Sequence, residues 1–248
     1  MNRDLLRLYL LLGLPLIVVL LVMSLFNETL PHWSGPAYIS ILLVAAAYLC
    51  AASWSQVAVR RVLTGSVALL VFVSLAGILV VRYYPSQLGS TDPGRLGKGD
   101  VTLDMNGWEQ FALKFDSLAD SDKKHGLMQP GAFILSDYWY PAANLDYYVA
   151  SPRHISFLAV GRLRDIHHYA WLNLQRPALA PGADAYFIYP SNYYGPPRES
   201  LRDNFQHVDS VEIPQQRMGV HVRNFVIYRM HGYMGGIAPD GVQPESRE

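Results

Sequence analysis

The stretch Val62–Val81, VLTGSVALLVFVSLAGILVV, runs for 20 residues without a charged side chain. Two more uncharged stretches precede it, Leu8–Phe26 with 19 residues and the shorter, alanine-rich Ala37–Ser53. Because a helix needs about 20 apolar residues to cross a ~30 Å hydrocarbon layer, the pattern predicts three transmembrane helices within residues 1–82. Leu8–Phe26 could instead be a signal peptide, but no small-x-small cleavage site follows it, which favours an anchor.

The positive residues predict the orientation of these helices. Arg3 and Arg7 precede the first stretch, and Arg60 and Arg61 lie between the second and third, whereas the loop 27–36 has no Lys or Arg. The positive-inside rule therefore places the N-terminus in the cytoplasm and everything after Arg82 outside. In a bacterium this would be a multi-pass protein of the inner (cytoplasmic) membrane with a periplasmic C-terminal domain.

Composition excludes several classes of protein. The formal net charge is zero, and residues 83–248 carry 15 bases against 18 acids, so no basic patch for nucleic acid is expected. Cys50 is the only cysteine, so no disulfide can form within the chain. The sequence has no GxGxxG, Walker, CxxC or HExxH motif, and neither a cofactor nor a metal is predicted.

The polar part of the chain predicts a small α/β domain over residues 100–233, after a Gly- and Pro-rich linker over 83–99 and before a disordered tail over 234–248. Hydrophobic periodicity predicts helices and strands in alternation, with a sheet that is at least partly parallel. The expected helices are 105–119 and 141–150, and the expected strands are 132–136, 155–160, 185–189, 208–213 and 222–228.

Two pairs of residues suggest binding sites. His32 and Trp33 lie in the predicted outer loop, where they could contact a phosphate, a sugar or a lipid headgroup, although an interfacial Trp and a solvated His are the simpler interpretation. The adjacent His167 and His168 lack the further ligands and the spacing that a zinc site needs, so a structural or surface role is favoured.

Two carboxylates and two groups of aromatic residues leave alternatives open. Asp137 and Asp146 could act as a general acid and base, but a helix cap or a turn hydrogen bond is the favoured interpretation of Asp137. The aromatic residues of 138–148 and 186–194 suit carbohydrate stacking and core packing equally well.

Several segments together resemble one family. Leu30–Tyr38, LPHWSGPAY, looks like a late loop and helix start of bacterial GT-C superfamily integral-membrane glycosyltransferases, the relatives of dolichyl-phosphate-mannose protein mannosyltransferases and lipid A aminoarabinose transferases. The likeness covers most of residues 30–232. In the polar part it is carried by Gly107–Glu109, Ser136–Ala143, Asp146–Ala150, His168–Asn173 and Pro190–Tyr193.

The resemblance implies transfer of a sugar from a polyprenyl-phosphate-linked donor to an acceptor at the outer face of the membrane, with His32 and Trp33 lining the donor cavity. Family members have about ten or more spanning helices and a catalytic acidic residue in their first outer loop. Here the first outer loop offers only Glu28, in a context that matches the late loop. The chain is therefore expected to be the C-terminal portion of such an enzyme, inactive without an N-terminal half or second chain, and no catalytic residue can be assigned.

Two other functions compete with this one. A non-catalytic, membrane-anchored domain or subunit that binds glycan or lipid is the main alternative. An independent hydrolase is disfavoured because neither a nucleophile elbow nor a metal motif is present.

Overall fold

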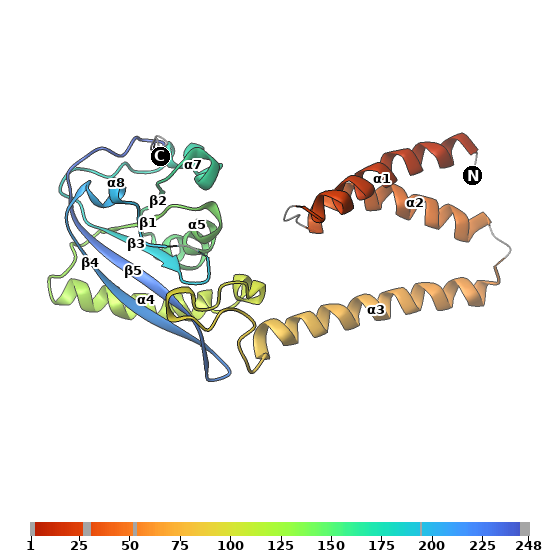
Figure 1. The fold of residues 1–248 in the computed structure, drawn as a ribbon, viewed down its shortest axis with the longest axis horizontal. Coiled ribbons are helices and arrows are strands. Elements are labelled where there is room, and N and C mark those ends of the chain that lie inside the picture. The colour runs from red at the N-terminus through yellow and green to blue at the C-terminus, as the bar shows by residue number, and fades with distance from the viewer. Residues whose placement is uncertain (1–2, 27–30, 52–53, 194, 244–248) are drawn as a thin grey trace. The chain divides into compact units, whose positions relative to one another are not determined.

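The protein is described by a computed structural model that covers residues 3–26, 31–51, 54–193 and 195–243. The chain divides into two compact units, Met1–Leu75 and Ala76–Glu248. Figure 1 shows long helices in the first unit and a mixed α/β domain in the second.

The first unit contains α1 (Arg3–Ser24), the short 3-10 helix η1 (Pro31–Ser34), α2 (Gly35–Ala51) and most of α3 (Gln56–Tyr83). Two helices, α1 and α3, are long and apolar enough to cross a membrane. The apolar helix α2 has 17 residues and so measures about 26 Å, which is shorter than a ~30 Å hydrocarbon layer. The structure therefore has two helices of sufficient length among the described residues, not the three that the sequence predicted.

Small residues bring α1 and α2 together. Gly13 is the buried residue of α1, and a Cβ added to it would lie 3.0 Å from the carbonyl oxygen of Ala37, which is fully buried. Such small residues allow two apolar helices to approach closely without a hydrophobic driving force between them.

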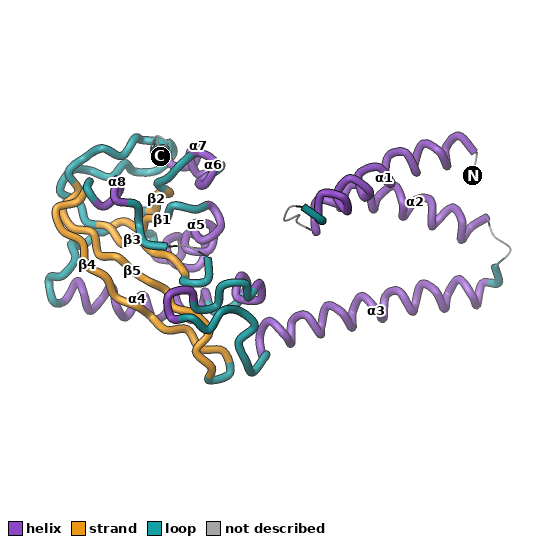
Figure 2. The backbone as a smooth tube through the Cα atoms, viewed as in Figure 1, coloured by secondary structure: helices purple, strands orange, loops and turns teal. Residues whose placement is uncertain are grey.

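A five-stranded mixed sheet organises the second unit. The strands are β1 (Phe133–Ser136), β2 (Phe157–Ala159), β3 (Ala185–Pro190), β4 (Phe205–Arg217) and β5 (Val220–Tyr233). Their order is β2-β1-β3-β5-β4, with β2, β1 and β3 parallel and β5 antiparallel to both of its neighbours. The predicted α/β class and partly parallel sheet are confirmed. Figure 2 shows β4 and β5 as a long hairpin that extends past the other strands.

Each face of the sheet carries its own apolar core. On one face α4 (Trp108–Lys124), α5 (Trp139–Leu145), the π-helical turn η4 (Asp146–Ala150) and α7 (Tyr169–Asn173) cover Ile134 of β1 and Ile188 of β3. On the other face α8 (Glu199–Arg202) and loops cover Leu135 and Phe187. Alternate side chains of each central strand therefore serve opposite cores, as the two-residue repeat of a strand requires. Short helices at η5 (Ser151–Arg153) and α6 (Leu163–Ile166) complete the connections.

Residues 83–99, predicted as a linker, belong to the second compact unit, and the carbonyl oxygens of Ser86 and Leu96 accept hydrogen bonds from Arg217 and Ser191 of that unit. They lead through η2 (Pro93–Arg95) into η3 (Val101–Met105). Within the predicted disordered tail, Gly241 and Gln243 exchange backbone hydrogen bonds with Gly161 at 3.0 and 2.9 Å, and residues 244–248 lie outside the described part. The folded domain therefore includes residues on both sides of the predicted 100–233.

Candidate functional site

The carboxyl ends of β1 and β3 form the topological switch point of the sheet. From β1 the chain passes through α5 to β2 on one side, and it then returns to β3 on the other side of β1. In open α/β sheets the connections diverge at such a point and leave a crevice in which ligands bind. Two clusters of polar residues lie at this edge.

The first cluster is centred on Asp137, which directly follows β1 and is 7% exposed. Burial raises the pKa of Asp137 to about 7, the nearby Arg198 opposes the rise, and the carboxylate of Asp165 adds to it. Helix α5 begins at Trp139 with Tyr138 as its N-cap, so Asp137 does not cap that helix and the favoured interpretation was wrong on this point. A carboxyl group with this pKa can give or take a proton near neutral pH.

Asp165 of α6 joins two arginines in the same cluster. Its Oδ2 accepts hydrogen bonds from Arg162 Nε at 2.6 Å and from Arg198 Nη2 at 2.8 Å. Burial alone would raise the pKa of Asp165, but these two guanidinium groups outweigh burial and lower it. The cluster thus combines one ionised carboxylate, Asp165, with a second carboxyl group, Asp137, that titrates near neutrality.

The second cluster is centred on Arg223 of β5, which has no exposed surface. Its guanidinium carbon lies 4.9 Å from the ring centroid of Trp108 and 4.5 Å from that of Phe225. It donates to Gln215 Oε1 at 2.5 Å and to the carbonyl oxygen of Asn106 at 2.7 Å. Burial lowers the pKa of Arg223 to about 9, so the group remains charged at neutral pH.

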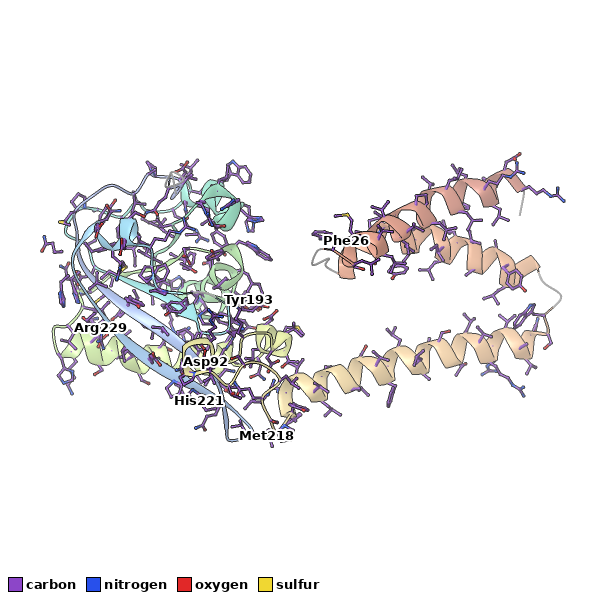
Figure 3. All side chains as sticks on the ribbon, in the orientation of Figure 1. Phe26, Asp92, Tyr193, Met218, His221 and Arg229 are labelled. Atoms are coloured by element: carbon purple, nitrogen blue, oxygen red, sulfur yellow. The ribbon has the colours of Figure 1, made fainter. Side chains whose placement is uncertain are left out.

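Asp104 and two tyrosines lie beside Arg223. Tyr193 donates to Asp104 Oδ2 at 2.8 Å, Tyr140 donates to the Asp104 carbonyl oxygen at 2.6 Å, and the two tyrosine rings lie 5.6 Å apart. Burial raises the pKa of Asp104, while the hydrogen bond from Tyr193 and the charge of Arg223 oppose the rise. Figure 3 labels Tyr193, whose side chain is 42% exposed.

Some buried polar atoms at this edge are not satisfied by protein groups. Within the part of the chain that the structure describes, Asp104 Oδ1, Ser136 Oγ and Asn192 Nδ2 have no hydrogen-bond partner. A buried polar atom without a partner costs about 1–3 kcal/mol. Asp104 and Asn192 both interact with Arg223, so a ligand that offers hydroxyl groups beside Arg223 would be stabilised there.

The two predicted aromatic groups are divided between core and surface. Tyr186 and Phe187 are buried in the two cores, as the packing interpretation expects. Trp139 and Tyr193 are exposed, and Trp139 lies 5.7 Å from both Tyr140 and His167, ring centroid to ring centroid. These contacts link four rings in sequence along the switch-point edge: His167, Trp139, Tyr140 and Tyr193.

Asp146, His167 and His168 do not belong to either polar cluster. Asp146 accepts a hydrogen bond from Arg176 Nη2 at 2.6 Å and another from Tyr169, so it belongs to a different network from Asp137. His167 and His168 are exposed, and no group of metal-ligating side chains occurs in the described ranges.

The predicted His32–Trp33 site stays a prediction. Both residues belong to η1, and Trp33 is 44% exposed. The side chain of His32 and the whole of Glu28 lie outside the described residues.

A cavity of the α/β unit lies at the opposite end of the parallel strands, at their amino ends. It has a volume of about 310 Å³ and is lined by apolar residues such as Phe115 and Met128 and by polar residues such as Lys123 and His154. The cavity is lined by residues that directly precede β1 and β2, whereas the switch-point crevice of a parallel sheet lies at the carboxyl ends of the strands. We therefore assign the candidate site to the two polar clusters.

Sequence reasoning missed Asp104, Asp165 and Arg223. Asp104 and Arg223 are 119 positions apart in the sequence, so no short motif contains both. The sequence carried one indication of the site: Arg223 is a charged residue within the strand predicted at 222–228, where most of the other residues are apolar.

Comparisons with protein-family models, with curated proteins and with solved structures found no match.

Proposed function

We propose that this chain is the C-terminal portion of a GT-C-type membrane glycosyltransferase. In this proposal α1, α2 and α3 span the inner membrane, and the α/β domain faces the periplasm. The assembled enzyme transfers a sugar from a polyprenyl-phosphate-linked donor to a periplasmic acceptor. Because two or three spanning helices are far fewer than such enzymes have, the chain is expected to need an N-terminal half, as a second chain or as a preceding segment.

One observation carries the proposal. The segments Ser136–Ala143 and Pro190–Tyr193, on which the resemblance rests, meet at the switch-point edge through the contact between Tyr140 and Tyr193. Gly107–Glu109 reaches the same place because Trp108 packs on Arg223. Convergence of segments that are far apart in sequence is the property expected of a site rather than of separate structural motifs.

The chemistry of this edge suits a sugar. Exposed rings of Trp139 and Tyr193 can stack on the apolar face of a pyranose, and the unsatisfied Asp104 Oδ1 and Asn192 Nδ2 can pair with its hydroxyl groups. In the proposal this edge binds and orients a glycosyl group. In the same proposal the N-terminal half of the enzyme supplies the catalytic acid.

A transfer assay tests the proposal. The chain is reconstituted in lipid, alone and together with the segment encoded upstream, and is given polyprenyl-phosphate mannose or polyprenyl-phosphate aminoarabinose labelled in the sugar. We expect no transfer by the chain alone and measurable transfer by the combination. Transfer by the chain alone, or an upstream segment without further spanning helices, would contradict the proposal.

The same assay tests the predicted donor cavity. His32→Ala in the combined enzyme is expected to lower transfer, and unchanged transfer would remove His32 from the site. Trp171→Ala, which truncates an exposed aromatic ring on α7, is a control.

The exposed rings also favour the alternative, a non-catalytic domain or subunit that binds glycan or lipid. In that case the chain alone binds the lipid-linked sugar, and the chain combined with the upstream segment shows no transfer. Trp139→Ala then weakens binding by roughly 2- to 12-fold, which corresponds to ~0.5–1.5 kcal/mol for an aromatic contact. Binding measured by native mass spectrometry in nanodiscs separates the two functions.

A further inference from the structure

The turn that joins β4 to β5 lies near the end of α3, and its role described below rests on the part of the proposed function in which α3 spans the membrane. Arg61 and Arg82 stand 21 positions apart on α3, which corresponds to about 32 Å of helix and matches a ~30 Å hydrocarbon layer. Arg82 therefore marks the outer boundary. The next two residues, Tyr83 and Tyr84, are aromatic, as is common at the headgroup level.

The last turns of α3 are fastened to the α/β domain. They belong to the same compact unit, and Asn106 Nδ2 donates to the carbonyl oxygen of Val81 at 2.9 Å. The last carbonyl groups of a helix lack partners within the helix, so this bond satisfies one of them with a side chain of the domain. A group of the domain is thereby held at the depth of Val81, next to the membrane boundary.

A buried ion pair holds the same segment against the β4–β5 hairpin. Arg217 at the end of β4 donates to Asp100 Oδ2 at 3.1 Å and to the carbonyl oxygen of Ser86 at 3.0 Å, and its guanidinium carbon lies 5.7 Å from the ring centroid of Tyr84. Side chains of both ion-pair partners have at most 1% of their surface exposed. The hairpin end at Arg217 is therefore next to the chain that leaves the membrane.

The surface at this place has the composition of a membrane-interface contact. Met218, the residue after Arg217, forms the turn with Gly219 and is 60% exposed; Figure 3 shows it at the tip of the hairpin. Tyr83 and Leu88 are exposed apolar residues of the same segment. Exposed basic residues accompany them: Arg82, Arg95 and Lys98. Apolar side chains enter the headgroup boundary, and bases pair with phosphates of anionic lipids.

We propose that the β4–β5 turn, together with residues 82–98, lies in the lipid headgroup layer and binds anionic lipid at the outer surface of the membrane. This surface sets the orientation of the domain: the hairpin stands on the bilayer at Met218 and leads away from it toward Phe205, about 40 Å along β4.

Site-specific quenching tests this surface in the full chain. Cys50→Ser provides a background without cysteine, and Met218→Cys is labelled with bimane in nanodiscs that contain phosphatidylglycerol and a lipid with a nitroxide on its headgroup. Asp203→Cys is the matched control, because it is exposed and lies at the opposite end of β4. We expect at least threefold stronger quenching at position 218 than at position 203. Equal quenching would overturn the proposal.

Two further measurements separate possible causes. Arg95→Glu combined with Lys98→Glu is expected to reduce quenching at 218 in phosphatidylglycerol nanodiscs but not in purely zwitterionic ones, and equal quenching with and without the substitutions in both lipids would remove the anionic-lipid part. Extraction of the chain from membranes by alkaline carbonate would overturn the span of α3 and this inference together. Absence of sugar transfer bears on the proposed function alone.

Discussion

The two compact units differ in which kinds of side chain they expose and which they bury. In Met1–Leu75 the described helices turn apolar side chains outward, such as Leu11 and Phe72, each 70% exposed, and Gly13 and Ala37 are the buried contact. In Ala76–Glu248 the apolar residues are inside, and Arg217 and Arg223 are buried with them. The same physical preference acts in both units. A helix in lipid needs no protein cover for its leucines, whereas a domain in water buries its apolar residues and can bury a charge only with partners.

The largest effect is expected where a buried charge loses its partner. Arg217→Ala leaves Asp100 buried without its guanidinium, and breaking such a pair typically costs about 3–5 kcal/mol. The free energy of unfolding of the α/β unit, followed by denaturant titration of the full chain in detergent, should fall by this amount. Arg217→Met with Asp100→Leu should restore much of it; if Arg217→Ala alone is harmless, the pair does not hold the segment that follows α3.

The pH dependence of Asp137 gives the next largest effect. Its pKa is raised from 3.8 to about 7, so the folded state prefers the protonated form. The stabilisation from this proton is complete below about pH 4 and is lost as the pH rises through 7. Asp137→Asn is therefore expected to be more stable than the wild type at pH 8, by on the order of 4 kcal/mol at most, with the difference closing by pH 4.

Asp209 is the control for Asp137, because its pKa is shifted in the opposite direction. Hydrogen bonds from Arg229 and His231 outweigh burial and lower the pKa of Asp209. Stability from Asp209 is present above pH 4 and is lost as the pH falls below that value, so Asp209→Asn should lower stability at pH 8. Unfolding curves at pH 5 and pH 8 distinguish the two signs, and a parallel response of both variants would contradict the assigned environments.

In the unit Met1–Leu75, a smaller effect is expected at the contact between α1 and α2. Gly13→Val places a Cβ 3.0 Å from the Ala37 carbonyl oxygen and adds further methyl groups, and overpacking costs about 1–3 kcal/mol. Gly77→Val on α3 is the matched control because nothing lies within 4 Å of its added Cβ. Resistance to unfolding in sodium dodecyl sulfate should drop for the first variant only. Equal behaviour would mean that α1 and α2 do not pack at Gly13.

The smallest effect is expected at an exposed ion pair. Arg202 and Glu199 approach to 3.6 Å, but their side chains are 40% and 86% exposed. Exposed pairs contribute about 0–1 kcal/mol because water and salt screen them. Glu199→Ala should leave the denaturation midpoint almost unchanged, and a loss comparable to that of Arg217→Ala would remove the contrast between buried and exposed charge.

Predictions from the local sequence pattern were confirmed where a continuous run of apolar residues decides the structure. The strands predicted at 132–136 and 185–189 agree with β1 and β3 because continuous apolar runs are buried on both faces of a parallel sheet. The strands predicted at 208–213 and 222–228 were too short: β4 continues over polar residues such as Gln215 and Arg217, and β5 begins at Val220 and ends at Tyr233. Partners from residues 84–107 bury those residues, and a window of neighbouring positions contains no information about them.

The candidate site, like the strands, was predictable from the sequence only in part. The position of Asp137 after a strand marked it for attention, but its burial and its neighbour Asp165 were outside the reach of the pattern. Asp146, considered with it, pairs with Arg176 instead.

By itself the sequence determined that this protein has uncharged helices suited to lipid, a following α/β domain and no metal or nucleotide motif, because each of these depends on composition or on neighbours along the chain. Tertiary structure alone decided which charges are buried, which rings share the switch-point edge and how the domain is fastened to the end of α3. Those features depend on contacts between residues as far apart as Asp100 and Arg217, whose energy exists only once the chain has folded.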